Sequence, residues 1–251
     1  MPQTPRIGHV TLTVNDLARM TAFYRDAIGL DVLSQDGTEA VLGAAVPLMV
    51  LRADPSARRA EAREAGLFHT AFLLPERADL GAWLLHASAS RLPIAGAADH
   101  DVSEALYMSD PEGNGIEVYW DRPRDDWSWT GDTVKMGTYQ LDLDGLAQEA
   151  GHWKGAPAGT TIGHIHMQVG ALSAAEEFWT GLGAAITHRY PGGTFYGWDG
   201  YHHHIATNTW NSRGAAPRSF PATGLAEVEI NIPGKPADMT DPWGTPVRVV
   251  G

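Results

Sequence analysis

The sequence predicts an α+β fold built from tandem βαβββ units. Two observations lead to this prediction: one order of strand, helix and short strands recurs along the chain, and the second half restates segments of the first. Residues 6–14 alternate as a strand does, and Asn15 and Asp16 can cap the helix that follows. Gly29 ends that helix, and short strands complete the unit, the last of them over 46–52.

The second unit repeats this order and ends on the most informative stretch of the chain. A strand is predicted over 66–75 and an amphipathic helix over 78–90, and short strands follow. A turn over 110–115 (DPEGNG) leads into a closing strand over 116–120. Glu117 is the charged residue of that strand. Because an unpaired buried carboxylate is expensive, Glu117 should have a partner, and a metal ion would be one.

The second half of the chain is an abbreviated copy of the first. Three of its segments align with earlier ones: 162–169 with 7–14, 224–233 with 66–75, and 241–249 with 110–118. The third unit also contains a predicted strand over 200–207 with three consecutive histidines. The fourth unit is shorter than the second, and we predict that it lacks the helix and one or two strands.

These repeats divide the chain into modules. We predict an N-terminal module of two βαβββ units over 1–121, a connector over 122–160, and an abbreviated C-terminal module over 161–251. The connector is rich in Asp, Gly, Trp and Pro, and one short helix is expected in it. The shortened fourth unit would leave an exposed sheet edge, which favours self-association into a homo-oligomer.

Composition restricts the classes of function. The chain has 251 residues, a formal net charge of −12 and a sequence pI near 5.2. This acidic balance argues against nucleic acid or an anionic membrane as a partner. Cysteine is absent, which excludes disulfides, zinc–thiolate sites and thiol catalysis. The chain has no apolar stretch of membrane-spanning length and no signal-peptide core near its first residues, so we expect a soluble cytoplasmic protein.

Three residues of metal-binding types occupy matched places in the first two units. His9 lies in the strand that opens unit one, His69 in the strand that opens unit two, and Glu117 in the strand that closes unit two. Two imidazoles and one carboxylate are the ligands of a facial triad, which leaves open positions on a non-haem Fe(II) ion. The sequence therefore predicts a metal site at His9, His69 and Glu117.

The paired βαβββ units, with the segments IGHV, FHTAFLLP and DPEGNGIEVYW, resemble the vicinal oxygen chelate superfamily of glyoxalases, bleomycin resistance proteins and extradiol dioxygenases. More narrowly, nearly the whole chain resembles two-module bacterial catechol 2,3-dioxygenases. The resemblance implies cupped half-barrel modules with a metal inside, bound by His9, His69 and Glu117. It also implies a tyrosine, here Tyr107, near the metal-bound substrate and a histidine that assists proton transfer, here His100.

The same resemblance implies the chemistry. The cofactor would be Fe(II), with Mn(II) or another divalent metal as alternatives, and the partners would be an aromatic diol of the catechol type and O2. Ring cleavage next to the diol would then give a semialdehyde-type product. Two alternatives use the same scaffold, since fold does not fix the reaction. They are a metal-dependent lyase or isomerase of the glyoxalase kind and a metal-free binding or resistance protein.

One departure from the family leaves a rival site open. Well-known two-module extradiol enzymes keep the metal in the C-terminal half, whereas here the complete triad is N-terminal. Arg248 aligns with Glu117, and an arginine cannot bind a metal. A C-terminal site would combine one residue from each of three places in that half: His164, then His202 or His204, then Glu227 or Glu229. We prefer the N-terminal site because its turn, tyrosine and glutamate occur together.

Overall fold

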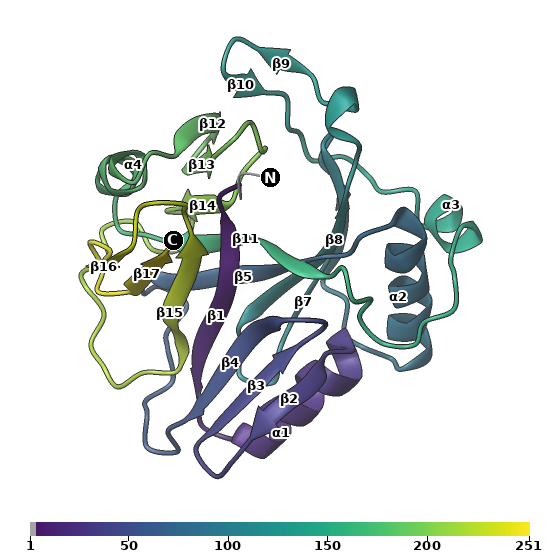
Figure 1. The fold of residues 1–251 in the computed structure, drawn as a ribbon, viewed down its shortest axis with the longest axis horizontal. Helices are drawn as coiled ribbons and strands as arrows, with labels where there is room; N and C mark the ends of the chain where they lie inside the picture. The colour runs from purple at the N-terminus through teal and green to yellow at the C-terminus, as the bar shows by residue number, and fades with distance from the viewer. Residues whose placement is uncertain (1–3) are drawn as a thin grey trace.

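The computed structural model describes residues 4–251, which form two curled β-sheets, each a cupped half-barrel (Figure 1). The first sheet contains β1 (Arg6–Val14), β2 (Asp31–Gln35), β3 (Glu39–Gly43), β4 (Pro47–Ala53), β15 (Gly224–Asn231), β16 (Ala237–Thr240) and β17 (Pro246–Val250). Their spatial order is β16-β17-β15-β1-β4-β3-β2.

The second sheet contains β5 (Gly66–Leu73), β6 (Gly96–Asp99), β7 (Ser103–Ser109), β8 (Gly115–Asp121), β11 (Thr161–Gln168), β12 (Ala185–Tyr190), β13 (Gly193–Gly197) and β14 (Ile205–Asn208). Their spatial order is β12-β13-β14-β11-β5-β8-β7-β6. Together the two sheets confirm the predicted α+β class with two half-barrels.

The helices are few and short. They are α1 (Leu17–Phe23) with a π-helical turn η1 (Tyr24–Ile28), α2 (Arg77–Ala89), a 3₁₀ turn η2 (Arg124–Asp126), α3 (Leu143–Gln148) and α4 (Leu172–Gly181). The first begins as its sequence predicts, because the Asp16 carboxylate accepts a hydrogen bond from the Arg19 backbone N–H at 3.0 Å. It ends at Gly29, which has a φ of 82° that glycine adopts without strain.

The two sheets do not correspond to the predicted modules over 1–121 and 161–251. Each half-barrel takes one unit from each half of the chain: β1 pairs antiparallel with β15, and β5 pairs antiparallel with β11. The four units open with similar strands, so strand pattern does not specify a partner. Doubling the length of a loop raises the free-energy cost of closing it by only about 0.6 kcal/mol, so a distant strand can pair almost as readily as a near one. Packing between the units therefore decides which strands pair.

The internal repeat holds at the level of single hydrogen bonds. In the turn before β8, one carboxylate oxygen of Asp110 accepts from the backbone N–H groups of Glu112 and Asn114. In the turn before β17, one carboxylate oxygen of Asp241 accepts from the backbone N–H groups two and four residues on in the same way. The sequence alignment of these two turns thus corresponds to one shared turn structure.

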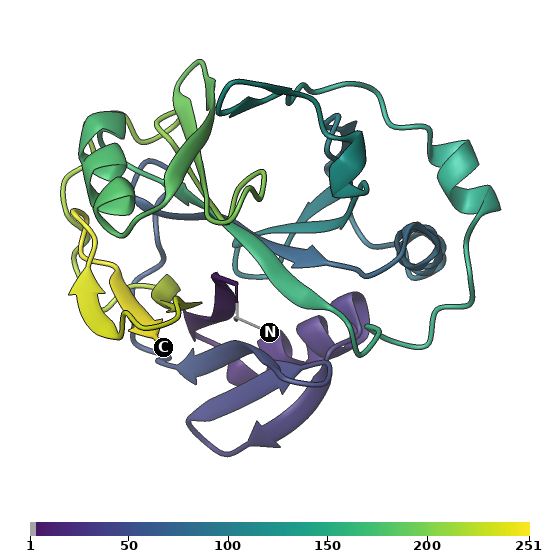
Figure 2. The same ribbon diagram turned by 45° about the horizontal axis from the view of Figure 1, so that its top comes forward.

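Two local predictions need correction, and one is confirmed. The connector contains a short hairpin of β9 (Trp129–Thr130) and β10 (Thr133–Val134) that the sequence analysis does not anticipate. Residues 201–204 form a loop, and only Ile205–Asn208 pair as a strand. The shortened fourth unit is confirmed, because between β15 and the end of the described chain there are two further strands and no helix. Figure 2 shows the connector following the outside of the molecule from the hairpin past α3 before it enters β11.

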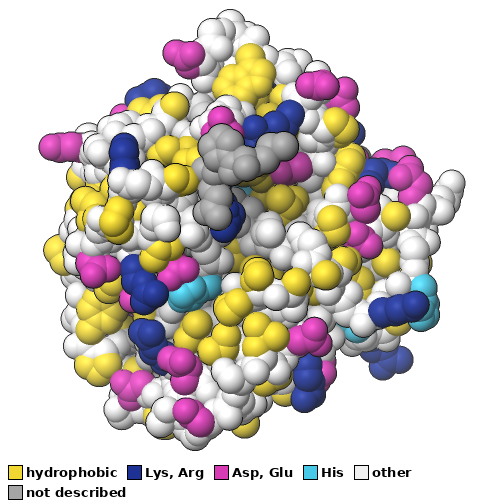
Figure 3. All heavy atoms as spheres, in the orientation of Figure 1, with side chains coloured by type: hydrophobic (Ala, Val, Ile, Leu, Met, Phe, Trp, Pro, Cys, Tyr) yellow, Lys and Arg dark blue, Asp and Glu magenta, His cyan; other side chains and the backbone are white. Residues whose placement is uncertain are grey.

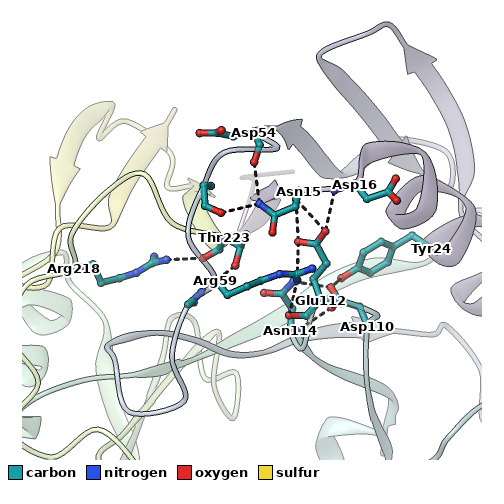
Figure 4. A network of polar contacts seen from close by, with 12 residues as sticks. Asn15, Asp16, Tyr24, Asp54, Arg59, Asp110, Glu112, Asn114, Arg218 and Thr223 are labelled. Carbon is teal, nitrogen blue, oxygen red and sulfur yellow. Dashed lines mark hydrogen bonds and ion pairs between the residues drawn. The ribbon is translucent and has the colours of Figure 1, made fainter.

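A polar network fixes the turn before β8 to the start of the first helix (Figure 4). The Glu112 carboxylate accepts from the backbone N–H groups of Asn15 and Asp16, each at 3.0 Å, and pairs with Arg59 at 3.2 Å. The Asp110 carboxylate accepts from the Tyr24 hydroxyl at 2.9 Å, and both groups are buried. These contacts join the two half-barrels at the turn that leads into the strand carrying Glu117.

We expect Tyr24→Phe to lower the free energy of unfolding by about 2 kcal/mol, because it removes one buried donor from a carboxylate. Burial, and then the Asp110 carboxylate, raise the pKa of Tyr24, so the hydroxyl keeps its proton and stays a donor. Urea denaturation measures the change. The matched control is Tyr139→Phe at a 53% exposed tyrosine, which should change stability by less than about 0.5 kcal/mol. Equal effects at the two positions would contradict the prediction.

One face of the molecule shows how charged and hydrophobic side chains are distributed. On the face shown in Figure 3, acidic and basic side chains are interspersed with hydrophobic ones. Within residues 4–251, no helix has both the length and the apolar character needed to cross a membrane.

Candidate metal centre

Three adjacent strands of the second sheet carry a cluster of metal-binding side chains. His69 lies on β5, Glu117 on β8 and His164 on β11, with β5 between the other two. Ala71 is registered with both His164 and Glu117, and residues two apart on a strand share a face. All three ligand-type side chains therefore project from one face of the sheet. Gly115 lies opposite His69, where an added Cβ would collide with the backbone of Phe68.

The geometry of this cluster fits a metal ion. Glu117 Oε2 lies 2.9 Å from His69 Nε2 and 3.1 Å from His164 Nε2, and the two nitrogens are 3.3 Å apart. Ligand atoms at right angles around an ion with bonds of about 2.1 Å lie about 3.0 Å from one another. Two Nε2–H groups could not both donate to Glu117 at these distances without crowding each other. A cation among the three atoms would satisfy all of them.

The electrostatics of Glu117 and His164 favour the protonation states that metal binding needs. Burial raises the pKa of Glu117, but the charges and hydrogen bonds of His164 and His69 outweigh it and hold that pKa well below the usual range. Burial lowers the pKa of His164, although Glu117 opposes this. An ionised carboxylate beside a neutral imidazole is the combination that binds a metal.

His9, the third predicted ligand, does not lie in this cluster. It is on β1 of the first sheet, where its Nδ1 lies 3.3 Å from Glu229 Oε1, and Arg248 contacts the other oxygen of Glu229 at 3.1 Å. The position that the sequence analysis gave to His9 is taken by His164, since β5 pairs with β11 rather than β1. The first half-barrel thus has an ion-pair cluster where the second has residues of metal-binding types.

A cavity of about 410 Å³ opens beside the triad. Its walls are aromatic, aliphatic and histidine side chains from both ends of the second sheet and from the connector: Phe68, His100, Tyr107, Met136, His166, His188, Tyr190, Phe195, His203 and Trp210, among others. No lysine or arginine lines it within the described part of the chain. A concave, mostly apolar pocket with a few convergent polar groups is typical of a small-molecule site.

The comparisons with known proteins agree with this geometry. The model of the Glyoxalase/Bleomycin resistance protein/Dioxygenase superfamily matches residues 6–118. Catechol-2,3-dioxygenase of Bacillus subtilis is 41% identical over 236 residues, which are 90% of this chain and 82% of that protein. The chain belongs to this superfamily.

Two further similarities fit the same assignment. Biphenyl-2,3-diol 1,2-dioxygenase 3 of Rhodococcus globerulus is 31% identical over 125 residues, covering 48% of this chain and 66% of that protein. The crystal structure of glyoxalase I from Zea mays aligns with a TM-score of 0.59 and 15% identity, covering 98% of this chain and 92% of that chain. The latter shows that the superfamily fold extends over both half-barrels.

The predicted pair His100 and Tyr107 does lie beside the triad. The Tyr107 hydroxyl is 2.7 Å from His100 Nε2, and His100 Nδ1 is 2.7 Å from the backbone oxygen of Gly137 in the connector. Because the backbone oxygen of Gly137 can only accept, His100 donates to it from Nδ1. A neutral His100 then accepts a hydrogen bond from the Tyr107 hydroxyl at Nε2. Burial, and then Glu117, raise the pKa of Tyr107, so its hydroxyl stays protonated.

His203 is a cavity residue that sequence reasoning missed. Its ring centroid lies 4.1 Å from that of His164, and burial, together with neighbouring histidines, lowers its pKa well below the usual range. The sequence analysis treated 200–207 as a strand, which would have turned His203 away from its neighbours. The loop over 201–204 instead lets consecutive side chains meet, and the triple histidine was the available signal.

The rival C-terminal site is not formed in the structure. His164 joins the triad of the second sheet, whereas Glu227 and Glu229 lie on β15 of the first sheet. His202 pairs with Asp121, and His204 Nδ1 accepts from the Trp198 backbone N–H at 3.3 Å. Within the described residues, His69, Glu117 and His164 form the one group with metal-binding spacing.

The buried side chain of His204 should make the stability of the fold sensitive to acid. Burial, and then His202, lower the pKa of His204 to about 3, against about 6.5 when unfolded. The unfolded chain therefore binds this proton first, and stability falls as pH drops from 6.5 toward 3. Between pH 6.5 and 5 this one group should cost about 1.5 kcal/mol.

Urea denaturation of the metal-free protein over that pH range measures the effect. The His204→Asn variant keeps an acceptor for Trp198 but cannot titrate, so its stability should fall less steeply with acid. An unchanged pH dependence in this variant would refute the assignment.

Proposed function

We propose that the protein is a non-haem Fe(II) extradiol dioxygenase that cleaves a catechol-type aromatic diol with O2. The observation that supports this most directly is the buried facial arrangement of His69, Glu117 and His164 at the inner end of an apolar cavity. The 41% identity to a protein named catechol-2,3-dioxygenase supports the same reaction.

His69, Glu117 and His164 would hold Fe(II), which would supply the electron transfer that activates O2. The ring bond next to the diol breaks, and both atoms of O2 enter the ring-opened product. The apolar walls of the cavity hold the ring and exclude water from the reacting atoms.

We assign the acid–base role to His203 rather than to His100. The acceptor nitrogen of His100 already accepts from Tyr107, and His166 Nε2 accepts from the Asn208 amide at 3.0 Å. His203 Nδ1 faces His202, and its Nε2 has no hydrogen-bond partner among the described residues. That nitrogen can take the proton of a diol hydroxyl and return it later. Tyr107, whose one hydroxyl proton is donated to His100, then presents its oxygen to the substrate as a hydrogen-bond acceptor.

The lining of the cavity also predicts the substrate class. No lysine or arginine of the described chain faces the cavity, so a ring carboxylate would be buried without a cationic partner. We expect catechols with uncharged or apolar substituents to exceed carboxylated catechols in kcat/KM by about 100-fold or more. Parallel steady-state assays with 4-methylcatechol and 3,4-dihydroxybenzoate test this. Equal values would contradict the prediction.

The decisive experiment is anaerobic reconstitution with Fe(II), followed by addition of catechol and then air, with absorbance monitored for a coloured ring-fission product. Reconstitution with Zn(II) is the control that should give no product. Failure to bind iron, or an iron-loaded protein without ring cleavage across a panel of uncharged catechols, would refute the proposal.

A further inference from the structure

A hydrogen-bonded chain leads from the cavity toward the surface on the side of His203. His203 Nδ1 lies 2.7 Å from His202 Nδ1, and His202 Nε2 lies 2.7 Å from Asp121 Oδ1. The other carboxylate oxygen of Asp121 accepts from the Tyr201 hydroxyl at 2.6 Å. His202 is completely buried, whereas the Asp121 side chain retains 16% of its exposure. The chain therefore connects a cavity base to a carboxylate near solvent.

The direction of each hydrogen bond follows from the carboxylate of Asp121 at the end of the hydrogen-bonded chain. An ionised Asp121 can only accept, so His202 must donate from Nε2. A neutral His202 then has an acceptor at Nδ1, and His203 must donate to it from its own Nδ1. A neutral His203 is consequently left with a lone pair on Nε2, the nitrogen without a partner among the described residues. One carboxylate thus specifies the tautomer of a histidine two links away.

Packing holds this arrangement in one orientation. The His202 ring packs against two aromatic side chains, with centroids 4.2 Å from Tyr201 and 5.0 Å from Trp127. Trp127 is itself fixed by a hydrogen bond from its Nε1 to the backbone oxygen of Arg122 at 2.9 Å. Neither ring nitrogen of His202 has another partner among the described residues. His202 therefore has no alternative to linking Asp121 with His203.

We propose that Asp121 and His202 are positioning residues that hold His203 in the Nδ1–H tautomer, with its basic Nε2 available in the cavity. This inference rests on the proposed function, in which His203 is the acid–base residue. When His203 holds a proton at Nε2, its Nδ1–H still donates to the neutral His202, and Asp121 stabilises the charge through that ring. The only bond that forms in the protein is the N–H bond at His203 Nε2, and the hydrogen bonds from His203 to His202 and from His202 to Asp121 keep their directions.

The test is a direct measurement of tautomers in the metal-free protein. In ¹⁵N-histidine-labelled protein, at a mildly alkaline pH where histidine is neutral, long-range ¹H–¹⁵N NMR spectra distinguish Nδ1–H from Nε2–H rings. The His203→Gln variant assigns the signals. We expect the Nδ1–H tautomer for His203 in the wild type. We expect Nε2–H in Asp121→Asn, because the amide can donate to His202 Nε2 and reverse every bond in the chain.

Two further variants complete the design. Tyr201→Phe removes only the second partner of Asp121 and should leave the tautomer of His203 unchanged. In the iron-loaded enzyme, Asp121→Asn should lower kcat about 10²- to 10⁴-fold with KM and iron content retained, and Asp121→Glu should recover part of the loss.

The spectroscopic arm decides the inference independently of activity. An Nε2–H His203 in the wild type would overturn it, since a protonated His202 would then be the donor. An Nδ1–H His203 that persists in Asp121→Asn would also overturn it. If Asp121→Asn does not fold, His202→Gln and the wild-type tautomer still provide the test. If no catechol is cleaved, the proposed function fails while the tautomer result stands on its own.

Discussion

Replacing His164 by alanine is expected to lower iron affinity by at least about 100-fold and to abolish ring cleavage, whereas His9→Ala should retain both. His164 Nε2 is one of three buried ligand atoms within 3.3 Å of one another, and two ligands cannot maintain the facial arrangement. Changes to groups that merely support metal ligands already cost about 10- to 100-fold in affinity, so loss of a ligand should cost more. His9 lies in the other sheet, paired with Glu229.

This pair of variants is well matched, since both histidines lie on strands that open a repeat unit. Metal content after anaerobic reconstitution, measured by elemental analysis, gives the first result, and turnover with an uncharged catechol gives the second. Circular dichroism shows whether each variant is folded. Loss of iron in a folded His9→Ala protein, with retention in His164→Ala, would restore the ligand set that the sequence analysis predicted.

The second large effect is expected at His203. His203→Asn should lower kcat about 10²- to 10⁴-fold while iron content and KM change little, because positioned general acid–base catalysis contributes about that much. The ring contacts His164 but is not one of the three ligand atoms. Steady-state kinetics of the iron-loaded protein and its elemental analysis measure the two quantities together.

His100→Asn is the comparison for this prediction. Because His100 contacts Tyr107 rather than presenting a free nitrogen to the cavity, we expect its loss to cost about 10-fold or less in kcat. A larger loss in His100→Asn than in His203→Asn would return the acid–base role to His100. Loss of iron from a folded His203→Asn protein would instead make His203 a fourth ligand.

Local chemistry made much of this protein predictable. The N-cap at Asp16, the left-handed Gly29 and the turn at Asp110 depend on residues within a few positions of one another. The same is true of the closing strand around Glu117, whose alternating apolar residues predict a buried face. The repeat then related units at long range, and the structure places His69, Glu117 and the pair of Tyr107 and His100 around one cavity.

The sequence by itself thus determined the α+β class, the order of the βαβββ units and the residues of the second unit that face the cavity. The tertiary structure decided which strand lies beside β5, and with it that His164 rather than His9 completes the triad. It also decided that residues 201–204 form a loop in which His202 and His203 meet. Strand pairing among four similar units is non-local, and the side-chain period that defines a strand carries no information about its neighbour.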